Sequence, residues 1–248
     1  MRISHKYKFV YIAIPKTGSS TVRYLLDKYS DISSDDPDWP SNYIHPNAKQ
    51  MKAYFGIKGW NWDEYFKFTV VRHPIPRIKS SIAYALKAGE QAYKSGIVSV
   101  KNNFSDDQTN ITEDCLRQIK KVQYNEDFIS KELKLYKKEI SIVEYMNKYM
   151  STQYSYTFDD SNNKFLLNTF IKLENLESGL QKVWKLLGLD NRDLLHIPRY
   201  NATEPLFQTI CWNRLKNMNA FDNITIKEFM WPFNLKFNQD FKFFKYKH

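Results

Sequence analysis

The clearest pattern along the chain is a pair of short apolar runs, each followed by a polar turn and an amphipathic segment. Residues 9–14 and 66–71 are apolar, aromatic or β-branched at almost every position, which is typical of strands covered on both faces. Residues 20–29 and 76–88 follow them with a helical period. Because a helical crossover makes consecutive strands parallel, the pattern predicts an α/β fold with a central parallel sheet flanked by helices.

A long helical segment interrupts this alternation. Residues 113–149 carry apolar side chains on a rough helical period, and we expect them to form most of a helical insertion at residues 89–149. Residues 30–41 are rich in Ser, Asp and Pro and predict a loop, and residues 46–55 predict a short helix. The pattern of the insertion is compatible with a substrate-binding region and, equally, with a helical brace on the core.

The C-terminal part predicts one more strand and one more helix. Residues 154–158 and 165–173 flank the stretch Asp-Asp-Ser-Asn-Asn, which predicts a hairpin-like excursion that leads into a strand. Residues 176–187 are amphipathic with a helical period, and Gly188 is suited to end that helix. Several aromatic side chains follow that we expect to pack on the core: Phe229, Trp231, Phe233, Phe237, Phe241, Phe243 and Phe244.

Composition fits a single α/β domain over residues 1–248. A chain of 248 residues with 42% hydrophobic residues can bury one core. No apolar run approaches the length of a membrane span and the first residues are polar, so we expect a soluble, cytoplasmic protein. The two cysteines, Cys115 and Cys211, lack the spacing of metal ligands, so no metal is expected. The formal net charge of +10 favours an anionic ligand, although a lysine-rich surface would give the same value.

The turn after the first strand has the composition of a phosphate-binding site. Residues 15–21 read Pro-Lys-Thr-Gly-Ser-Ser-Thr and lie where a strand ends and a helix begins. The start of a helix presents N–H donors and a positive dipole end, which suit a phosphate group. Gly18 gives the turn backbone freedom and Lys16 adds a mobile positive charge. A helix cap beside a surface lysine would have a similar sequence.

The second strand also ends in cationic and hydroxyl side chains. Arg72 follows that strand directly, and Ser80 lies eight positions further on, in the helix that Pro76 is expected to open. Ligands in open α/β sheets bind beyond the carboxyl ends of the strands. We therefore expect the turn at residues 15–21 and the pair Arg72 and Ser80 to bind one ligand that has two separated phosphate groups.

Together, the two motifs resemble those of the sulfotransferase superfamily, whose members use 3′-phosphoadenosine 5′-phosphosulfate (PAPS). The matching stretches are PKTGSST at residues 15–21 and VRHPIPRIKSS at residues 71–81. Residues 170–203 resemble the carbohydrate branch, sulfotransferase family 2. The polar N-terminus is similar to that of its soluble bacterial members, or to that of an animal member whose membrane anchor has been removed. The resemblance implies a P-loop-like sulfotransferase fold. It also implies transfer of a sulfuryl group from PAPS to a hydroxyl of a saccharide, glycolipid or other glycoconjugate, with 3′-phosphoadenosine 5′-phosphate (PAP) as product and no metal.

The resemblance also implies roles for individual residues. Arg72 and Ser80 would hold the 3′-phosphate, and Arg199 is a further candidate for that group, although a surface arginine is as good an interpretation. Lys16 would be catalytic, because it would stabilise the bridging oxygen as the S–O bond breaks. The residues expected to hold the 5′-phosphosulfate are Lys16, Thr17, Gly18, Ser19, Ser20 and Thr21.

Sulfuryl transfer needs a base that accepts the proton of the acceptor hydroxyl. His45 is the only histidine between the two motifs, and it matches the place where many members of the family carry a catalytic histidine. Its ordinary pKa suits a base at neutral pH. A loop histidine beside Pro46 is the alternative interpretation. Some members use a glutamate, but Glu64, the only one before Arg72, directly precedes the second strand and fits a surface residue better.

Other polar residues near the motifs are expected to be structural. We expect His73 to be structural or a minor contact of the nucleotide, and Arg77 to pair with a carboxylate and brace the motif. Glu174 and Asn175 follow a strand end and fit a helix-capping pair better than a catalytic one.

Two other classes of protein share some of these features. A P-loop kinase requires Gly-x-x-x-x-Gly-Lys-Ser/Thr, whereas here Lys16 precedes Gly18 and no second loop glycine exists. A nucleic-acid-binding module would suit the basic charge and the many aromatic residues. The aromatic residues fall in core-like patterns, however, and the two predicted anion sites lie at strand ends, so we expect no nucleic acid. The glycan-type acceptor is what the resemblance to the carbohydrate sulfotransferases implies.

Overall fold

The computed structural model describes residues 1–33, 45–94, 131–159, 161–198 and 236–247. Contacts between residues divide the chain into two compact units. The first unit comprises Met1–Ile78, Ser151–Ala202 and Phe233–His248, and the second comprises Lys79–Met150 and Thr203–Pro232. The second unit contains the predicted insertion at residues 89–149.

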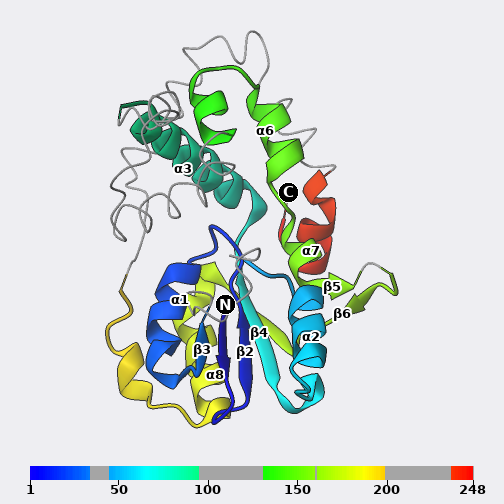
Figure 1. Cartoon of the computed structure of the whole chain (residues 1–248). Helices are drawn as coiled ribbons and strands as arrows, with labels where there is room; N and C mark the ends of the chain where they lie inside the picture. The colour runs from blue at the N-terminus through cyan, green and yellow to red at the C-terminus, as the bar shows by residue number, and fades with distance from the viewer. Residues whose placement is uncertain (34–44, 95–130, 160, 199–235, 248) are drawn as a thin grey trace, which may run out of the picture. The chain divides into compact units, whose positions relative to one another are not determined.

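The first unit is built on a five-stranded sheet with the order β3-β1-β2-β4-β7 (Figure 1). Strands β2, β4 and β7 are parallel, and β1 is antiparallel to both of its neighbours, β2 and β3. The predicted α/β fold with a central parallel sheet is confirmed for β2, β4 and β7, and β1 makes the sheet mixed. The strands are β1 (Arg2–Ser4), β2 (Phe9–Ile12), β3 (Ile32–Ser33), β4 (Phe66–Val71) and β7 (Thr169–Lys172).

Helices cover both faces of this sheet. The helices include α1 (Ser19–Leu26), α2 (Ala48–Ile57), α3 (Pro74–Lys94), α6 (Ile142–Tyr149), α7 (Gln153–Thr157) and α8 (Leu176–Leu187). Figure 1 shows α1 and α8 on one side of the sheet and α2 on the other. Alternate residues of β2 point to opposite faces: Tyr11 packs in the cluster with α1 and α8, and Ile12 packs in the cluster with α2. Both faces of β2 are buried, which fits a strand that is apolar or aromatic at every position.

Most predicted helices are present with shifted ends. The predicted helix at residues 20–29 is α1 followed by a 3₁₀ turn, η1 (Asp27–Tyr29). Helix α3 begins at Pro74 rather than at Pro76 and extends further than predicted. Helix α2 begins at a capping box, in which the Asn47 side chain accepts from the Gln50 backbone and the Gln50 side chain accepts from the Asn47 backbone. Helix α8 ends at Gly188, with φ of 67°, as predicted.

The predicted hairpin that leads into a strand is confirmed, but its first arm is shorter than expected, because residues 154–158 are not extended along their length. These residues belong mostly to α7, and only a short hairpin of β5 (Phe158–Asp159) and β6 (Lys164–Phe165) follows. The Thr152 side chain caps α7 by accepting from the Ser155 backbone. Such a cap, together with long-range contacts of the helix start, outweighs the strand propensity of the aromatic residues. Strands β1 and β3 were not predicted.

The second unit is helical where it is described. It holds α3 from Lys79 onward, helical residues 131–136 and α6. A Cβ at Gly89 would lie 2.3 Å from the carbonyl oxygen of Glu132, so α3 packs there directly on backbone. The Tyr145 hydroxyl donates to Glu132 Oε1 over 2.8 Å. The helical prediction is confirmed for these parts, and residues 95–130 lie outside the described part of the chain.

Two further sequence predictions concern the aromatic residues near the C-terminus and the presence of membrane-spanning segments. Phe237, Phe241 and Phe244 are buried, as expected for aromatic residues that pack on the core. The predictions for Phe229, Trp231 and Phe233 lie outside the described residues. In the part of the chain that the structure describes, no helix has both the length and the apolar character needed to cross a membrane.

Candidate functional site

The site begins with the turn between β2 and α1. Lys16 and Gly18 both have left-handed backbone conformations, with φ of 66° and 79°. The Thr17 hydroxyl donates to the carbonyl oxygen of Ile14 over 2.9 Å, which closes the turn from inside. Gly18 is the N-cap residue of α1, and its carbonyl oxygen accepts from the backbone N–H of Thr21. No side chain caps this helix and no acidic residue lies in its first turn, so its N-terminus suits an anion.

Gly18 also lies close to the turn after β7. A Cβ at this position would lie 2.7 Å from Leu173 Cδ1. Leu173 belongs to the 3₁₀ turn η3 (Leu173–Asn175), which follows β7. The turn after β2 and the turn after β7 therefore touch at the carboxyl edge of the sheet, where the ends of parallel strands meet.

Two arginines bind the carbonyl side of the turn. Arg77 is fully buried, and its Nε donates to the carbonyl oxygen of Pro15 over 3.1 Å. Arg72 Nη1 lies 3.4 Å from the carbonyl oxygen of Lys16. Arg77 also donates to the carbonyl oxygen of Ser151 over 3.0 Å. Arg77 thus braces the turn through backbone carbonyls, whereas its predicted carboxylate partner acts only at longer range, as the charge of Asp240.

Burial destabilises the protonated forms of Lys16 and Arg72. It lowers the pKa of Lys16 to about 8, and the positive charge of Arg72 adds to this effect. Burial also lowers the pKa of Arg72, while the negative charge of Glu174 acts in the opposite direction. A bound anion would relieve both effects, because an opposite charge favours the protonated form. Desolvated cations at a helix N-terminus therefore fit a phosphate or phosphosulfate group.

His45 is attached to the same turn. Its Nδ1 lies 2.9 Å from the carbonyl oxygen of Ala13. A carbonyl oxygen only accepts, so Nδ1 carries the proton and Nε2 of the neutral ring keeps its lone pair. Burial lowers the pKa of His45 to about 4, partly opposed by the bond to Ala13. The imidazole is therefore neutral at pH 7 and has the tautomer that a base requires.

The other residues predicted to bind the two phosphate groups differ in where they lie and in which contacts they make. Ser19 is buried at the start of α1, and Arg23 Nη2 lies 3.5 Å from the hydroxyl of Ser20. The Thr21 hydroxyl donates to the carbonyl oxygen of Pro198 over 2.9 Å, so its proton is used inside the protein. Arg199 lies outside the described residues. Ser80 lies on α3 in the second unit, whereas Arg72 belongs to the first, and their joint contact with one phosphate stays a prediction.

His73 and Glu174 hold the end of β4 to the C-terminal segment. His73 Nε2 donates to the carbonyl oxygen of Lys247 over 3.1 Å, and its Nδ1 accepts from the Ile75 backbone. Glu174 accepts from the His73 backbone over 2.9 Å and from the Tyr246 hydroxyl over 3.0 Å. Both ring nitrogens of His73 are thus in use, which fits a structural role. Glu174 joins two segments instead of capping a helix.

Sequence reasoning missed Gln153 and Asp240. Both are fully buried, and the Gln153 amide bonds to both backbone groups of Arg72. Asp240 accepts from the start of α7. No sequence signal joins these residues to the site, because they lie 81 and 87 positions from their partners.

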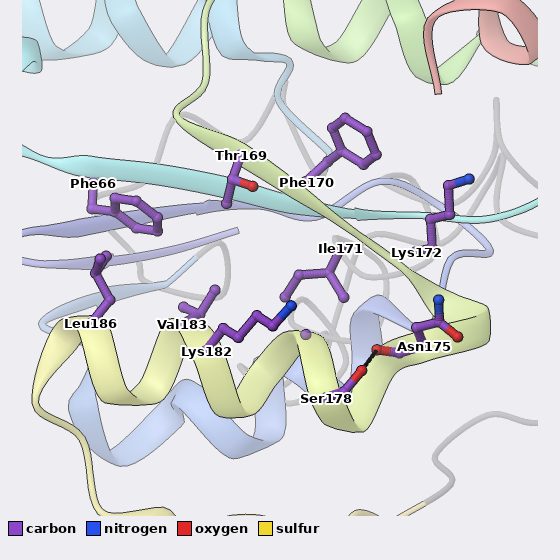
Figure 2. A pocket seen from close by; sticks show the side chains of 11 residues that line it. Phe66, Thr169, Phe170, Ile171, Lys172, Asn175, Ser178, Lys182, Val183 and Leu186 are labelled. Carbon is purple, nitrogen blue, oxygen red and sulfur yellow. Dashed lines mark hydrogen bonds between the residues drawn. The ribbon is translucent and has the colours of Figure 1, made fainter. Parts of the chain in front are cut away.

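A hollow of about 410 Å³ lies elsewhere in the first unit, between β7 and α8. Figure 2 shows its lining side chains, which are a mixture of apolar and polar groups and include two lysines. One of them, Lys172, donates to the carbonyl oxygen of Lys245. The lining residues are Phe66, Thr169, Phe170, Ile171, Lys172, Asn175, Ser178, Gly179, Lys182, Val183 and Leu186. None of the predicted site residues lines this hollow. Over the described ranges, no group of three His, Cys, Asp or Glu residues is arranged to hold a metal.

The sheet, the uncapped helix start and the desolvated cations define an α/β protein suited to bind an anionic group at the carboxyl edge of its sheet. A model of the sulfotransferase family matches residues 1–247. The chain therefore belongs to the sulfotransferase family, in its family 2 branch, and is a sulfotransferase enzyme. A search of curated proteins and a search of solved structures each returned no match.

Proposed function

We propose that the protein transfers a sulfuryl group from PAPS to a hydroxyl of a saccharide or glycoconjugate, with PAP as the second product. One observation carries the proposal: Lys16 and the Ala13 carbonyl that orients His45 belong to the same turn, three residues apart. A cation for the departing phosphate and a base for the acceptor are thereby attached to one short segment. Membership of the sulfotransferase family supports the same reaction class.

The turn and α1 would bind the 5′-phosphosulfate. The backbone N–H groups at the start of α1 and the hydroxyls of Ser19 and Ser20 supply donors, and the helix dipole favours negative charge. Thr17 would contribute through its backbone, because its hydroxyl proton is bound to Ile14. Thr21 would shape the helix start instead of donating to the ligand, because its hydroxyl donates to Pro198 and its backbone N–H donates to Gly18. Lys16 would donate to the bridging oxygen and so stabilise the charge that develops on the phosphate.

The 3′-phosphate would be held beyond the end of β4. Arg72 is the residue at that position, and burial has already removed part of the water around its guanidinium. Its planar group can bind two phosphate oxygens at once. Ser80 and Arg199 are further candidates for this phosphate.

His45 would take the proton of the acceptor hydroxyl at Nε2. As the acceptor oxygen forms its bond to sulfur, the bond from sulfur to the phosphate oxygen breaks, and its electron pair stays on the phosphate. With a pKa of about 4 in the free protein, His45 is a weak base. A nearby anion raises the pKa of an imidazole, so the donor would strengthen this base when it binds.

The proposal is tested by binding and turnover. Calorimetry should show that PAP binds the wild type and that ATP and a single-stranded oligonucleotide do not compete with it. A labelled-sulfate assay with PAPS and a panel of glycans should show transfer that is lost in His45→Asn and kept in His5→Asn, a histidine that contacts Tyr65 away from the turn. Tight binding of ATP or of the oligonucleotide without binding of PAP would contradict the proposal.

A further inference from the structure

The side chain of Gln153 takes the place of a strand partner just beyond the end of β4. Strand β4 ends at Val71, whose partner in β7 is Lys172. The next residue, Arg72, donates its backbone N–H to Gln153 Oε1 over 2.7 Å and accepts from Gln153 Nε2 over 2.8 Å at its carbonyl oxygen. A primary amide offers the same donor and acceptor as a peptide group. Gln153 therefore continues the pairing of β4 by one residue and fixes the backbone from which the Arg72 side chain leaves.

Asp240 sets the orientation of this amide. Its Oδ2 accepts from the backbone N–H of Gln153 over 2.9 Å and lies 3.4 Å from Gln153 Nε2. Its Oδ1 accepts from the backbone N–H of Tyr154 over 2.7 Å. If the amide were reversed, its oxygen would face two acceptors, the Asp240 carboxylate and the Arg72 carbonyl. The Asp240 carboxylate thus selects one orientation and at the same time binds the N-terminus of α7.

The start of α7 is also joined to the phosphate-binding turn. Arg77 donates to the carbonyl oxygens of Ser151 and of Pro15. Arg77, Gln153 and Asp240 are all buried to at least 98%, so water does not compete for these bonds. The backbone of Arg72 and the turn that holds Lys16 are therefore bound to one buried framework.

We propose that Gln153 and Asp240 are positioning residues for Arg72, which they hold in place to bind a phosphate of the nucleotide. The inference rests on the proposed function, since it takes Arg72 as the ligand of the 3′-phosphate. Neither residue touches the nucleotide. Their effect on its binding passes through the backbone of Arg72, so it disappears when the Arg72 guanidinium is removed.

A double-mutant cycle on PAP affinity tests this dependence. Gln153→Met keeps the length of the side chain but removes both bonds to Arg72, and we expect the Kd for PAP to rise about tenfold. In an Arg72→Ala background the same change should alter the Kd less than about twofold. An equal loss in both backgrounds would overturn the inference, because Gln153 would then act on the site as a whole.

Two further variants separate positioning from general destabilisation. Thr157→Val removes buried hydroxyl bonds within the same helix, to the carbonyl oxygens of Gln153 and Tyr154, without a contact to Arg72. It should lower the melting temperature and leave the Kd for PAP unchanged. If Gln153→Met does not fold, Asp240→Asn runs the same cycle and should show the same dependence on Arg72. A wild type that does not bind PAP would instead contradict the proposed function.

Discussion

The His45 imidazole donates from Nδ1 to the carbonyl oxygen of Ala13, at the carboxyl end of the apolar segment that contains β2. This single bond joins a histidine that follows β3 in the chain to the turn that carries Lys16. It fixes the ring tautomer and leaves Nε2 as the nitrogen able to accept a proton.

The first prediction concerns stability against pH. The pKa of His45 is about 4 in the folded protein and near 6.5 in a model peptide. Between these values the unfolded chain binds more protons at this position, so the free energy of unfolding falls as the pH drops from about 6.5 to 4. His45→Asn keeps a donor for Ala13 but does not titrate. Urea unfolding at several pH values should show a smaller acid loss in this variant, and an identical loss would contradict the low pKa.

The second prediction concerns the His45 proton during binding. PAP carries negative charge to the turn and should raise the pKa of His45 above its value of about 4. The imidazole signals in an NMR titration with and without PAP report this shift. In the assay, His45→Asn should lower kcat by about 10²- to 10⁴-fold while the Kd for PAP stays within about twofold. A large loss of PAP affinity would instead make His45 a binding residue.

The third prediction concerns Lys16. With a pKa of about 8 in the free protein, Lys16 is mostly neutral at pH 8.5, and a bound phosphate should protonate it. Calorimetry of PAP binding at pH 8.5 in buffers of different ionisation enthalpy should reveal proton uptake. The uptake should vanish in Lys16→Met, which should also lower kcat by about 10²- to 10³-fold. Uptake that persists in the variant would assign the proton to another group.

The fourth prediction separates the two phosphates of the nucleotide. Arg72→Ala should raise the Kd for PAP at least about tenfold, while the Kd for AMP, which lacks the 3′-phosphate, should stay nearly constant. The two ligands are compared by calorimetry on the same preparation. An equal loss for both would place Arg72 at the 5′ end, next to the Lys16 carbonyl oxygen that it contacts.

The fifth prediction concerns Gly18 and has a matched control. Gly59 has a similar φ of 69° but open space where a Cβ would lie. Gly59→Ala should therefore lower the free energy of unfolding by about 1–2 kcal/mol, the strain of a left-handed backbone at a residue with a Cβ. Gly18→Ala adds a clash with Leu173 and should destabilise the protein by about 1–3 kcal/mol more. Equal losses in urea unfolding would show that Leu173 moves aside freely.

The parallel strands and the main helices of the first unit could be predicted from the sequence, because β2 is apolar or aromatic throughout, β4 is so except at Lys67 and Thr69, and α8 has a clear period. The antiparallel strands β1 and β3 are too short to leave a pattern. The polar stretch Asp-Asp-Ser-Asn-Asn predicts extended arms on both sides of a hairpin, whereas at residues 154–158 a cap at Thr152 and a distant carboxylate start a helix.

The sequence likewise identified some residues of the candidate site and not others. His45 was identified from its place between two motifs, but its bond to Ala13 depends on how the chain folds back over 32 positions. Gln153 and Asp240 were not identified at all, since a buried glutamine and a buried aspartate have no local signal. The pattern of a sequence reports neighbours along the chain, and these contacts form between distant segments.

The bond from Thr21 to Pro198 has a consequence for synthesis on the ribosome. It joins positions 177 residues apart. The contacts of Gln153 with the Arg72 backbone likewise depend on Asp240, which is synthesised later still. At about 5–20 residues per second, the 219 residues from Thr21 to Asp240 take roughly 10–40 s to translate. During this interval the residues of the phosphate-binding turn have been synthesised, but the segments that hold this turn in place have not. Partial chains that stop before Asp240 would therefore have the motif without a formed site.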